Sequence, residues 1–358
     1  MGTWRTSAGW ICLAVVTLAV HAAGAEQAPW TTFARQGRFV TSLLATPDAL
    51  WIGTEDQGLW RLNLSADPAD AGAWTQFIGD DGPHTEHVYG LAEDAAGRLW
   101  VGTVNAGVSV YNGQAWRNYG VLDGCLGERV FAIAADTDPD RGRVWIGTDQ
   151  GLVCWTPDPD PPADAGSDNA SLAPGTWRTV TCTDGLPSDQ VCAVAVGPGG
   201  QVWAGTECDG LAWSRPPYTR WQTVRARAER SGDEGEAPGI KKGTAPGLPS
   251  NLINDLVVTD DGNIVAATDY GLGLGRPGGR GWVGWQGLDK EPFRNTVRGV
   301  AVDGAGDLWM ATRHKGLARL STASGQVEAF AQDRGDANYG FDVAVTPAGE
   351  VWMGTYGG

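Results

Sequence analysis

A four-residue phrase that recurs along the chain constrains the fold more than any other feature of this sequence. It begins with tryptophan in six of its seven copies, has glycine or alanine in third position and ends with threonine. The copies occupy residues 51–54, 100–103, 145–148, 203–206, a degraded 265–268, 309–312 and 352–355. Successive copies start 43 to 62 residues apart. Short β-rich runs and glycine-rich turns repeated at this spacing are typical of a β-propeller.

Each copy of the phrase is expected to form the second strand of a blade. In the second repeat, residues 88–92, 99–103, 108–111 and 116–119 are short runs with strand-like composition separated by glycine-containing turns, which predicts four antiparallel strands. Side chains alternate faces along a strand, so the tryptophan and the third residue point the same way. We therefore interpret the tryptophans as packing between blades, not as ligand contacts. The predicted fold is an all-β, seven-bladed β-propeller of four-stranded antiparallel blades.

The repeat is offset at the chain ends. The first strand-like run, residues 30–33, reads as the fourth strand of a blade, and the sequence stops at Gly358, where a seventh third strand would start. We expect this N-terminal strand to join the last blade and close the ring, which removes exposed sheet edges. The last blade is then expected to lack its third strand. A truncated copy of the repeat explains this better than a closing strand paired one position inward.

The first 25 residues have the layout of a secretory signal peptide. Residues 11–20 form an apolar run, and Ala23-Gly24-Ala25 supplies small residues for cleavage. The predicted domains are a signal peptide over 1–25 and a propeller over 26–358, with insert loops at 157–175 and 225–247 that are rich in Pro, Gly and charge. The predicted location is the periplasm or the exterior, and the oligomeric state stays open.

The charge of the chain limits the partners that it can have. A formal net charge of −16 argues against nucleic acid and against anionic lipid surfaces. The sequence shows no Cys-x-x-Cys pair or His/Cys cluster with zinc spacing, so we expect neither a metal nor a cofactor.

Several segments carry a family resemblance. Residues 184–191 read DGLPSDQV, residues 247–253 read GLPSNLI, and residues 149–152 read DQGL. With the repeated Trp-x-Gly-Thr phrase, these resemble the two-component regulator propeller repeat over about residues 30 to 358. The resemblance implies a bacterial extracytoplasmic sensor that binds a ligand, often a polysaccharide fragment, and that works with a membrane sensor kinase or another protein. The chain would then stand alone or form the front of a longer sensor.

The expected binding site is the mouth of the central channel, where loops that enter the first strands and loops that leave the second strands meet. Three aligned columns of residues lie there: the two positions before each first strand and the position after each repeated threonine. The predicted ligand-binding residues are Arg38, Glu86, His87, Glu128, Arg129, Asp189, Asn251, Asn295, Arg313, His314 and Asn338. Asn and Asp at such places also cap turns, so the Arg and His side chains carry more of the functional argument.

Two other functions fit the same scaffold. A propeller can serve as a platform for protein interactions, and some seven-bladed propellers are lyases. In the lyase alternative, Glu86, His87 and His314 would supply a general acid and base. The main prediction remains a sensor that binds a small polar ligand such as a glycan fragment.

Overall fold

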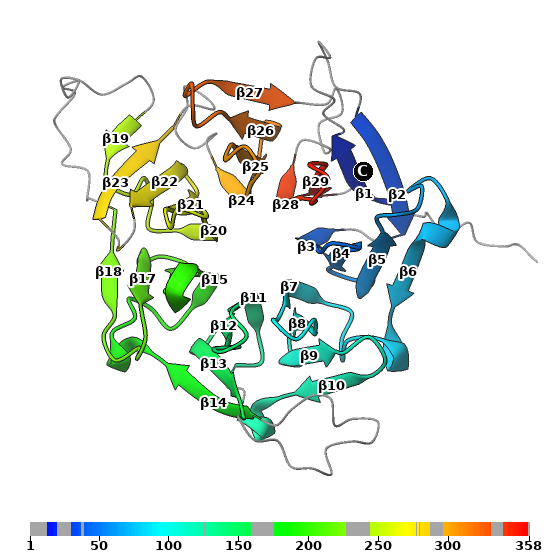
Figure 1. The fold of residues 1–358 in the computed structure, drawn as a ribbon, viewed down its shortest axis with the longest axis horizontal. Coiled ribbons are helices and arrows are strands. Elements are labelled where there is room, and N and C mark those ends of the chain that lie inside the picture. The colour runs from blue at the N-terminus through cyan, green and yellow to red at the C-terminus, as the bar shows by residue number, and fades with distance from the viewer. Residues whose placement is uncertain are drawn as a thin grey trace, which may run out of the picture.

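The computed structural model describes residues 13–19, 30–36, 39–124, 127–158, 175–226, 244–276, 278, 280–286, 296–330 and 339–356. The described strands form seven antiparallel sheets arranged in a ring (Figure 1). Each first strand contacts the first strands of the two neighbouring sheets, so the ring closes on itself. The predicted all-β propeller of four-stranded antiparallel blades is confirmed. No helix in this described part is long and apolar enough to cross a membrane.

The strands follow the same order in every blade, from the central channel outward. The first strands are β3 (Val40–Ala45), β7 (Val88–Glu93), β11 (Val130–Ala135), β15 (Val191–Val196), β20 (Ile253–Val258), β24 (Val297–Val302) and β28 (Gly340–Val345). The second strands are β4 (Ala49–Thr54), β8 (Leu99–Thr103), β12 (Val144–Thr148), β16 (Val202–Thr206), β21 (Ile264–Thr268), β25 (Leu308–Thr312) and β29 (Val351–Thr355). The third strands are β5 (Leu59–Asn63), β9 (Val108–Tyr111), β13 (Gly151–Pro157), β17 (Leu211–Ser214), β22 (Gly271–Arg276), β26 (Gly316–Leu320) and β1 (Leu13–Ala19). The fourth strands are β6 (Trp74–Phe77), β10 (Trp116–Tyr119), β14 (Gly175–Val180), β18 (Gln222–Val224), β23 (Arg280–Trp285), β27 (Val327–Phe330) and β2 (Trp30–Gln36).

Short 3-10 turns precede or connect several strands. They are η1 (Ala71–Ala73), η2 (Gly79–Asp81), η3 (Val121–Asp123), η4 (Cys182–Asp184) and η5 (Pro198–Gly200). Six sheets are each built from one continuous stretch of chain, and the remaining sheet combines the two ends of the chain.

The sheet that combines both ends of the chain, here called the closing sheet, corrects two predictions: that the last blade lacks its third strand, and that a single N-terminal strand closes the ring. Its order is β2-β1-β29-β28, so residues 30–33 do lie in the same blade as the last repeat, as expected. The blade is not incomplete, however, because β1 pairs with β29 on one side and with β2 on the other. Two N-terminal strands therefore close the ring instead of one. Residues 13–19 belong to the apolar run predicted for a signal peptide, and in this structure they fill the third-strand position.

The two predicted insert loops lie largely outside the described residues. Of the first insert, the structure describes residues 157, 158 and 175, and of the second it describes 225, 226 and 244–247. The end of the second insert is not a loop. Strand β19 (Thr244–Pro246) pairs with β23 and adds a fifth strand to the outside of the fifth sheet.

The glycine of the repeated phrase makes room for the next blade. A Cβ atom added to Gly102 would stand 2.4 Å from Cγ1 of Val130, the first residue of β11. The glycines of four further copies face the Val or Ile at the same position of the following blade: Gly53, Gly147, Gly205 and Gly354. In the sixth blade the phrase has Ala311, and the residue that faces it is Gly340. The close approach is therefore kept at that interface by moving the glycine to the other side.

The threonine of the phrase stabilises the turn that follows it. Its hydroxyl donates a hydrogen bond of 2.7–2.9 Å to the carbonyl oxygen of the glycine that ends the turn in six blades, from Thr54, Thr103, Thr148, Thr206, Thr268 and Thr312. This buried bond holds the turn between second and third strands in one conformation. The residue after each threonine is consequently presented at a fixed place on the same end of the ring.

We expect Gly102→Ala to destabilise the propeller by about 1–3 kcal/mol, because the new methyl group would overpack the contact with Val130. The matched control is Gly304→Ala. Nothing lies within 4 Å of a Cβ at Gly304, so its effect should stay within about 0.5 kcal/mol. Urea unfolding of the two variants measures the difference. Equal stabilities would show that the blades can separate enough to accept the methyl group.

Candidate functional site

The predicted columns do meet at one end of the ring. Main-chain N–H groups after the repeated threonine bond to the carbonyl just before a first strand in six blades: Glu55 to Phe39, Val104 to His87, Asp149 to Arg129, Glu207 to Gln190, Arg313 to Thr296 and Tyr356 to Tyr339. Each such bond joins the entry of a first strand to the exit of the second strand in the same blade. These paired positions, together with the bulge residues described below, form what we call the channel mouth.

A β-bulge occurs in every first strand. The register with the second strand shifts at Thr41, Tyr89, Phe131, Cys192, Asn254, Arg298 and Phe341. A bulge re-aims the extra side chain, and bulges are common beside active sites. All seven residues are partly buried. Several reach the turn residue after the repeated threonine, as when the Asn254 amide donates to Asp269 over 3.1 Å.

The closing blade and the first blade bring four aromatic rings together at the mouth. The ring centroids of Phe39 and Tyr356 are 4.1 Å apart, those of Tyr339 and Tyr356 are 5.4 Å apart, and those of Tyr339 and Phe341 are also 5.4 Å apart. We call Phe39, Tyr339, Phe341 and Tyr356 the aromatic platform. Tyr356 remains 46% exposed, so part of the platform faces solvent.

Two arginines border the platform. The guanidinium carbon of Arg313 lies 5.7 Å from the Tyr339 ring centroid, and that of Arg298 lies 6.0 Å from the Phe341 centroid. Cations within about 6 Å of an aromatic ring are attracted to its face. The Nε atom of Arg298 is buried and has no hydrogen-bond partner among the described residues. The platform therefore combines apolar ring faces with donors that can bind oxygen atoms.

A second, polar part of the mouth spans the first three blades. The Glu55 carboxylate lies close enough to the Tyr89 hydroxyl to affect its pKa. Burial raises the pKa of Tyr89, Glu55 raises it further, and the nearby positive charge of Arg129 opposes both. Tyr89, Glu55 and Arg129 thus share one electrostatic environment, although they come from three different blades. Tyr89 stays a neutral donor at physiological pH.

Two buried carboxylates join neighbouring blades beneath the mouth. Asp342 accepts a hydrogen bond of 2.7 Å from the Leu43 N–H of the first blade, and Asp255 accepts one of 2.8 Å from the Val300 N–H of the sixth. Burial raises the pKa of Asp255 to about 8, and the negative charge of Asp342 adds to the effect. Burial also raises the pKa of Asp342, to about 6.

These raised values predict a pH dependence of stability. The native state holds these protons more tightly than the unfolded state, so the free energy of unfolding should fall as pH rises from about 4 towards 8. We expect Asp342→Asn to reduce that fall, because it removes the negative charge beside Asp255 and keeps an oxygen that can accept from Leu43. Urea unfolding at pH 5 and pH 8 measures both slopes. An unchanged slope in the variant would show that Asp342 neither has a raised pKa of its own nor raises that of Asp255.

The predicted site residues have different fates. Glu86, His87, Glu128, Arg129, Arg313 and His314 are exposed at this end of the ring. Asp189 and Asn251 have structural roles. The Asp189 side chain accepts a 2.6 Å hydrogen bond from the Cys182 N–H, and the Asn251 side chain accepts a 2.7 Å hydrogen bond from the Ala226 N–H. Arg38, Asn295 and Asn338 lie outside the described residues.

The residues of the lyase alternative come from two separate blades. Glu86 and His87 precede β7 in the second sheet, whereas His314 lies in the turn between β25 and β26 of the sixth.

The aromatic platform was not predicted as a unit. Phe39, Tyr339 and Tyr356 stand in the aligned columns, but the predicted ligand-binding residues are the polar and charged members of those columns. Arg298 and Phe341 lie at bulges, which shift register without any recognisable residue pattern. The available signal was the concentration of aromatic residues in the last repeat and immediately before the first one.

Comparison with known proteins agrees with the sequence resemblance. Residues 82–105 match the family model described as "two component regulator propeller", which confirms that resemblance. No curated protein matches the sequence.

Among solved structures, the extracellular domains of two putative hybrid two component systems from B. thetaiotaomicron are similar to this chain. Their TM-scores are 0.65 and 0.63 at 20% and 18% identity, and the match covers 90% and 96% of this chain. It covers only 38% and 39% of those chains, so this chain spans well under half of their length. Virginiamycin B lyase from Staphylococcus aureus is also similar, with a TM-score of 0.59, 10% identity and coverage of 90% of this chain and 96% of the lyase. At these identities the likeness shows a common propeller fold.

Proposed function

We propose that this propeller is an extracytoplasmic sensor or binding module of the two-component type, and that its channel mouth recognises a small polar ligand such as a glycan fragment. The observation that carries the proposal is the aromatic platform bordered by Arg298 and Arg313. A sugar ring presents an apolar face of C–H groups and an edge of hydroxyl groups. Aromatic faces suit the first, and arginine donors suit the second.

The position of these residues supports a binding role over a structural one. Propeller blades bury their apolar residues against one another, whereas Tyr356 keeps 46% of its surface exposed. Arg129 and His87 are exposed at the same end of the ring, at positions where other blades have Leu252 or Tyr339. The fold does not require a charge at these positions, so selection for a ligand explains them better.

The family resemblance supplies the proposed setting. A propeller outside the cytoplasm would pass its ligand state to a membrane sensor kinase or to another protein. The extracellular domains of the similar hybrid two component systems share the fold, which supports this setting. A cleavable signal peptide over residues 1–25 would export the chain, and that part of the proposal stands on the sequence alone.

The proposal is tested by screening the purified protein on a glycan array and by measuring each positive glycan with isothermal titration calorimetry. The expected result is saturable binding of one class of oligosaccharide. Absence of glycan binding, together with a protein partner captured through the same face, would instead support the interaction-platform alternative.

A further inference from the structure

The interfaces between blades are filled by aromatic rings in a regular way. The tryptophan of the repeated phrase meets a ring on the third or fourth strand, or on the turn joining them, of the following blade. The ring centroids are 6.4 Å apart for Trp51 and Tyr111, 4.8 Å for Trp100 and Trp155, 4.8 Å for Trp145 and Tyr218, and 6.1 Å for Trp203 and Trp282. Four successive interfaces, from the first blade to the fifth, are sealed in this way.

The interface between the fifth and sixth blades lacks both rings. Val265 stands where the phrase has tryptophan in the other six blades. On the facing blade, Val327 pairs with Leu320 in the register in which Trp177 pairs with Trp155 in the third blade. An aliphatic residue therefore replaces an aromatic one on each side of this interface. Val265 and Val327 are too small to fill the volume that two aromatic rings fill at the other interfaces.

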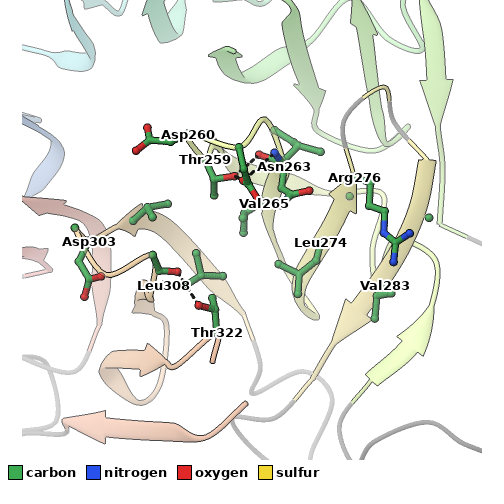
Figure 2. A pocket seen from close by; sticks show the side chains of 17 residues that line it. Thr259, Asp260, Asn263, Val265, Leu274, Arg276, Val283, Asp303, Leu308 and Thr322 are labelled. Carbon is green, nitrogen blue, oxygen red and sulfur yellow. Dashed lines mark hydrogen bonds between the residues drawn. The ribbon is translucent and has the colours of Figure 1, made fainter. Parts of the chain in front are cut away.

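A cleft of about 620 Å³ opens at this interface (Figure 2). One wall is a cross-strand row on the fifth blade, formed by Val265, Leu274 and Val283, which pair in register and so share a face. The other wall is formed by Val302 and Leu308 of the sixth blade, which also pair in register. The volume lies within the range of about 300–1,000 Å³ that is usual for small-molecule sites.

The rim of the cleft is asymmetric in charge. Asp260 and Asp303 lie on one side in Figure 2, and Arg276 lies on the other. Asp303 is held in place because it accepts a 2.9 Å hydrogen bond from the Trp309 indole and further bonds from two main-chain N–H groups. Asp260 is exposed, and Asp261 lies next to it in the same turn. The acidic side of the rim can therefore attract a cation.

The cleft is separate from the channel mouth. It is lined by the turn after β20 and the turn after β24, which join first strands to second strands. The mouth is built from the opposite ends of these strands. A ligand in the cleft would therefore touch none of the residues proposed to bind a glycan.

We propose that this cleft is a second binding site, which takes a small molecule consisting of one flat aromatic ring and a cationic amine. The shape of the ligand follows from the missing indole of the repeated phrase. The other interfaces of this chain hold an indole at the equivalent place, so a flat ring of similar size should fit here. Apolar clefts of this kind bind small aromatic molecules. The polar side chains Thr259, Asn263 and Thr322, which also line the cleft, already donate hydrogen bonds within the protein, so they suit a sugar poorly. The amine would lie towards Asp260 and Asp303.

Tryptamine is the probe that tests the proposal, with indole-3-acetate as the probe of opposite charge. Calorimetry on the wild-type protein should show one saturable tryptamine site, with indole-3-acetate binding at least about fivefold more weakly because its charge opposes the acidic rim. Val265→Trp should abolish tryptamine binding and raise the melting temperature, since the new indole fills the cleft. Leu122→Trp is the control, because Leu122 is fully exposed and a new indole there should leave tryptamine binding unchanged.

Two further variants keep the test decisive. Val283 is 39% exposed at the edge of the cleft, so Val283→Lys should fold and should exclude tryptamine through its charge and length. Asp260→Asn should reduce the preference for tryptamine over indole-3-acetate. The proposal is overturned if wild-type protein shows no saturable binding at millimolar tryptamine, or if folded Val265→Trp protein binds tryptamine as well as wild type does.

Discussion

Removal of residues 1–36, which deletes strands β1 and β2, should open the ring and destabilise the propeller by on the order of 5 kcal/mol or more. That is a large part of the roughly 5–15 kcal/mol that stabilises a typical protein. The closing sheet would keep only β28 and β29, and an isolated two-stranded sheet is marginal in water. The inner strand β29, which pairs with β1 in the intact sheet, would become an exposed edge.

The deletion is best measured by differential scanning calorimetry with a rescue in trans. A synthetic peptide of residues 11–36 should bind the shortened protein and restore most of the lost melting temperature, whereas a scrambled peptide of the same composition should not. An unchanged melting temperature in the shortened protein would show that the ring closes without these strands.

A chain that begins at Glu26 separates the roles of the two strands. It is the expected product of signal cleavage, and it keeps β2 but lacks β1. Because β1 lies between β29 and β2, its loss leaves β2 without the partner that it has in the closing sheet. The mass of the exported protein shows which N-terminus it carries, and calorimetry of both forms shows what β1 contributes. Residues 13–19 cannot both be removed with a signal peptide and remain as strand β1, so the N-terminus of the mature chain distinguishes the two assignments.

The blade architecture was predictable because its signal is repeated and each copy has a physical reason. Tryptophan packs against the next blade, glycine leaves space for that blade, and threonine donates a hydrogen bond to the following turn. Each copy of the phrase is weak evidence alone, but the seven copies support one another. Strand β1 was not predictable, since a short apolar run of Leu, Ala and Val fits a signal peptide as well as a strand. As a strand, this run pairs with a segment more than 300 residues away, and that pairing leaves no local mark in the sequence.

The site was predictable in position and less so in composition. Alignment of the repeats correctly indicated which ends of the strands form the mouth. It did not show that the side chains of Asp189 and Asn251 accept hydrogen bonds from main-chain N–H groups. The platform depends on Phe39 and Tyr356, which lie near opposite ends of the chain and meet only when the ring closes. The cleft beside Val265 likewise forms only when the fifth and sixth blades pack together, because each blade supplies one of its walls.

Tyr339→Ala combined with Tyr356→Ala should abolish detectable binding of a glycan ligand while leaving the fold intact. Each truncation removes a ring of the platform, and aromatic contacts at the centre of a binding site commonly contribute about 2 kcal/mol or more each. Loss of two rings, about 4 kcal/mol together, therefore predicts a fall in affinity of about a thousandfold. Tyr356 is 46% exposed, so its removal should cost little stability. Calorimetry with the glycan found in the array screen measures the loss.

Tyr270→Ala is the matched control, because Tyr270 lies in the turn after another repeated threonine and has a similar exposure of 43%. The described structure gives it no ring contact with the platform, so wild-type affinity is expected. The double variant Arg129→Ala and His87→Ala examines the polar part of the mouth independently. If that variant loses binding and the tyrosine variant does not, the ligand lies over the first three blades. Wild-type affinity in both would place the ligand away from the mouth, because together they remove the ring faces and the charged donors on which this site depends.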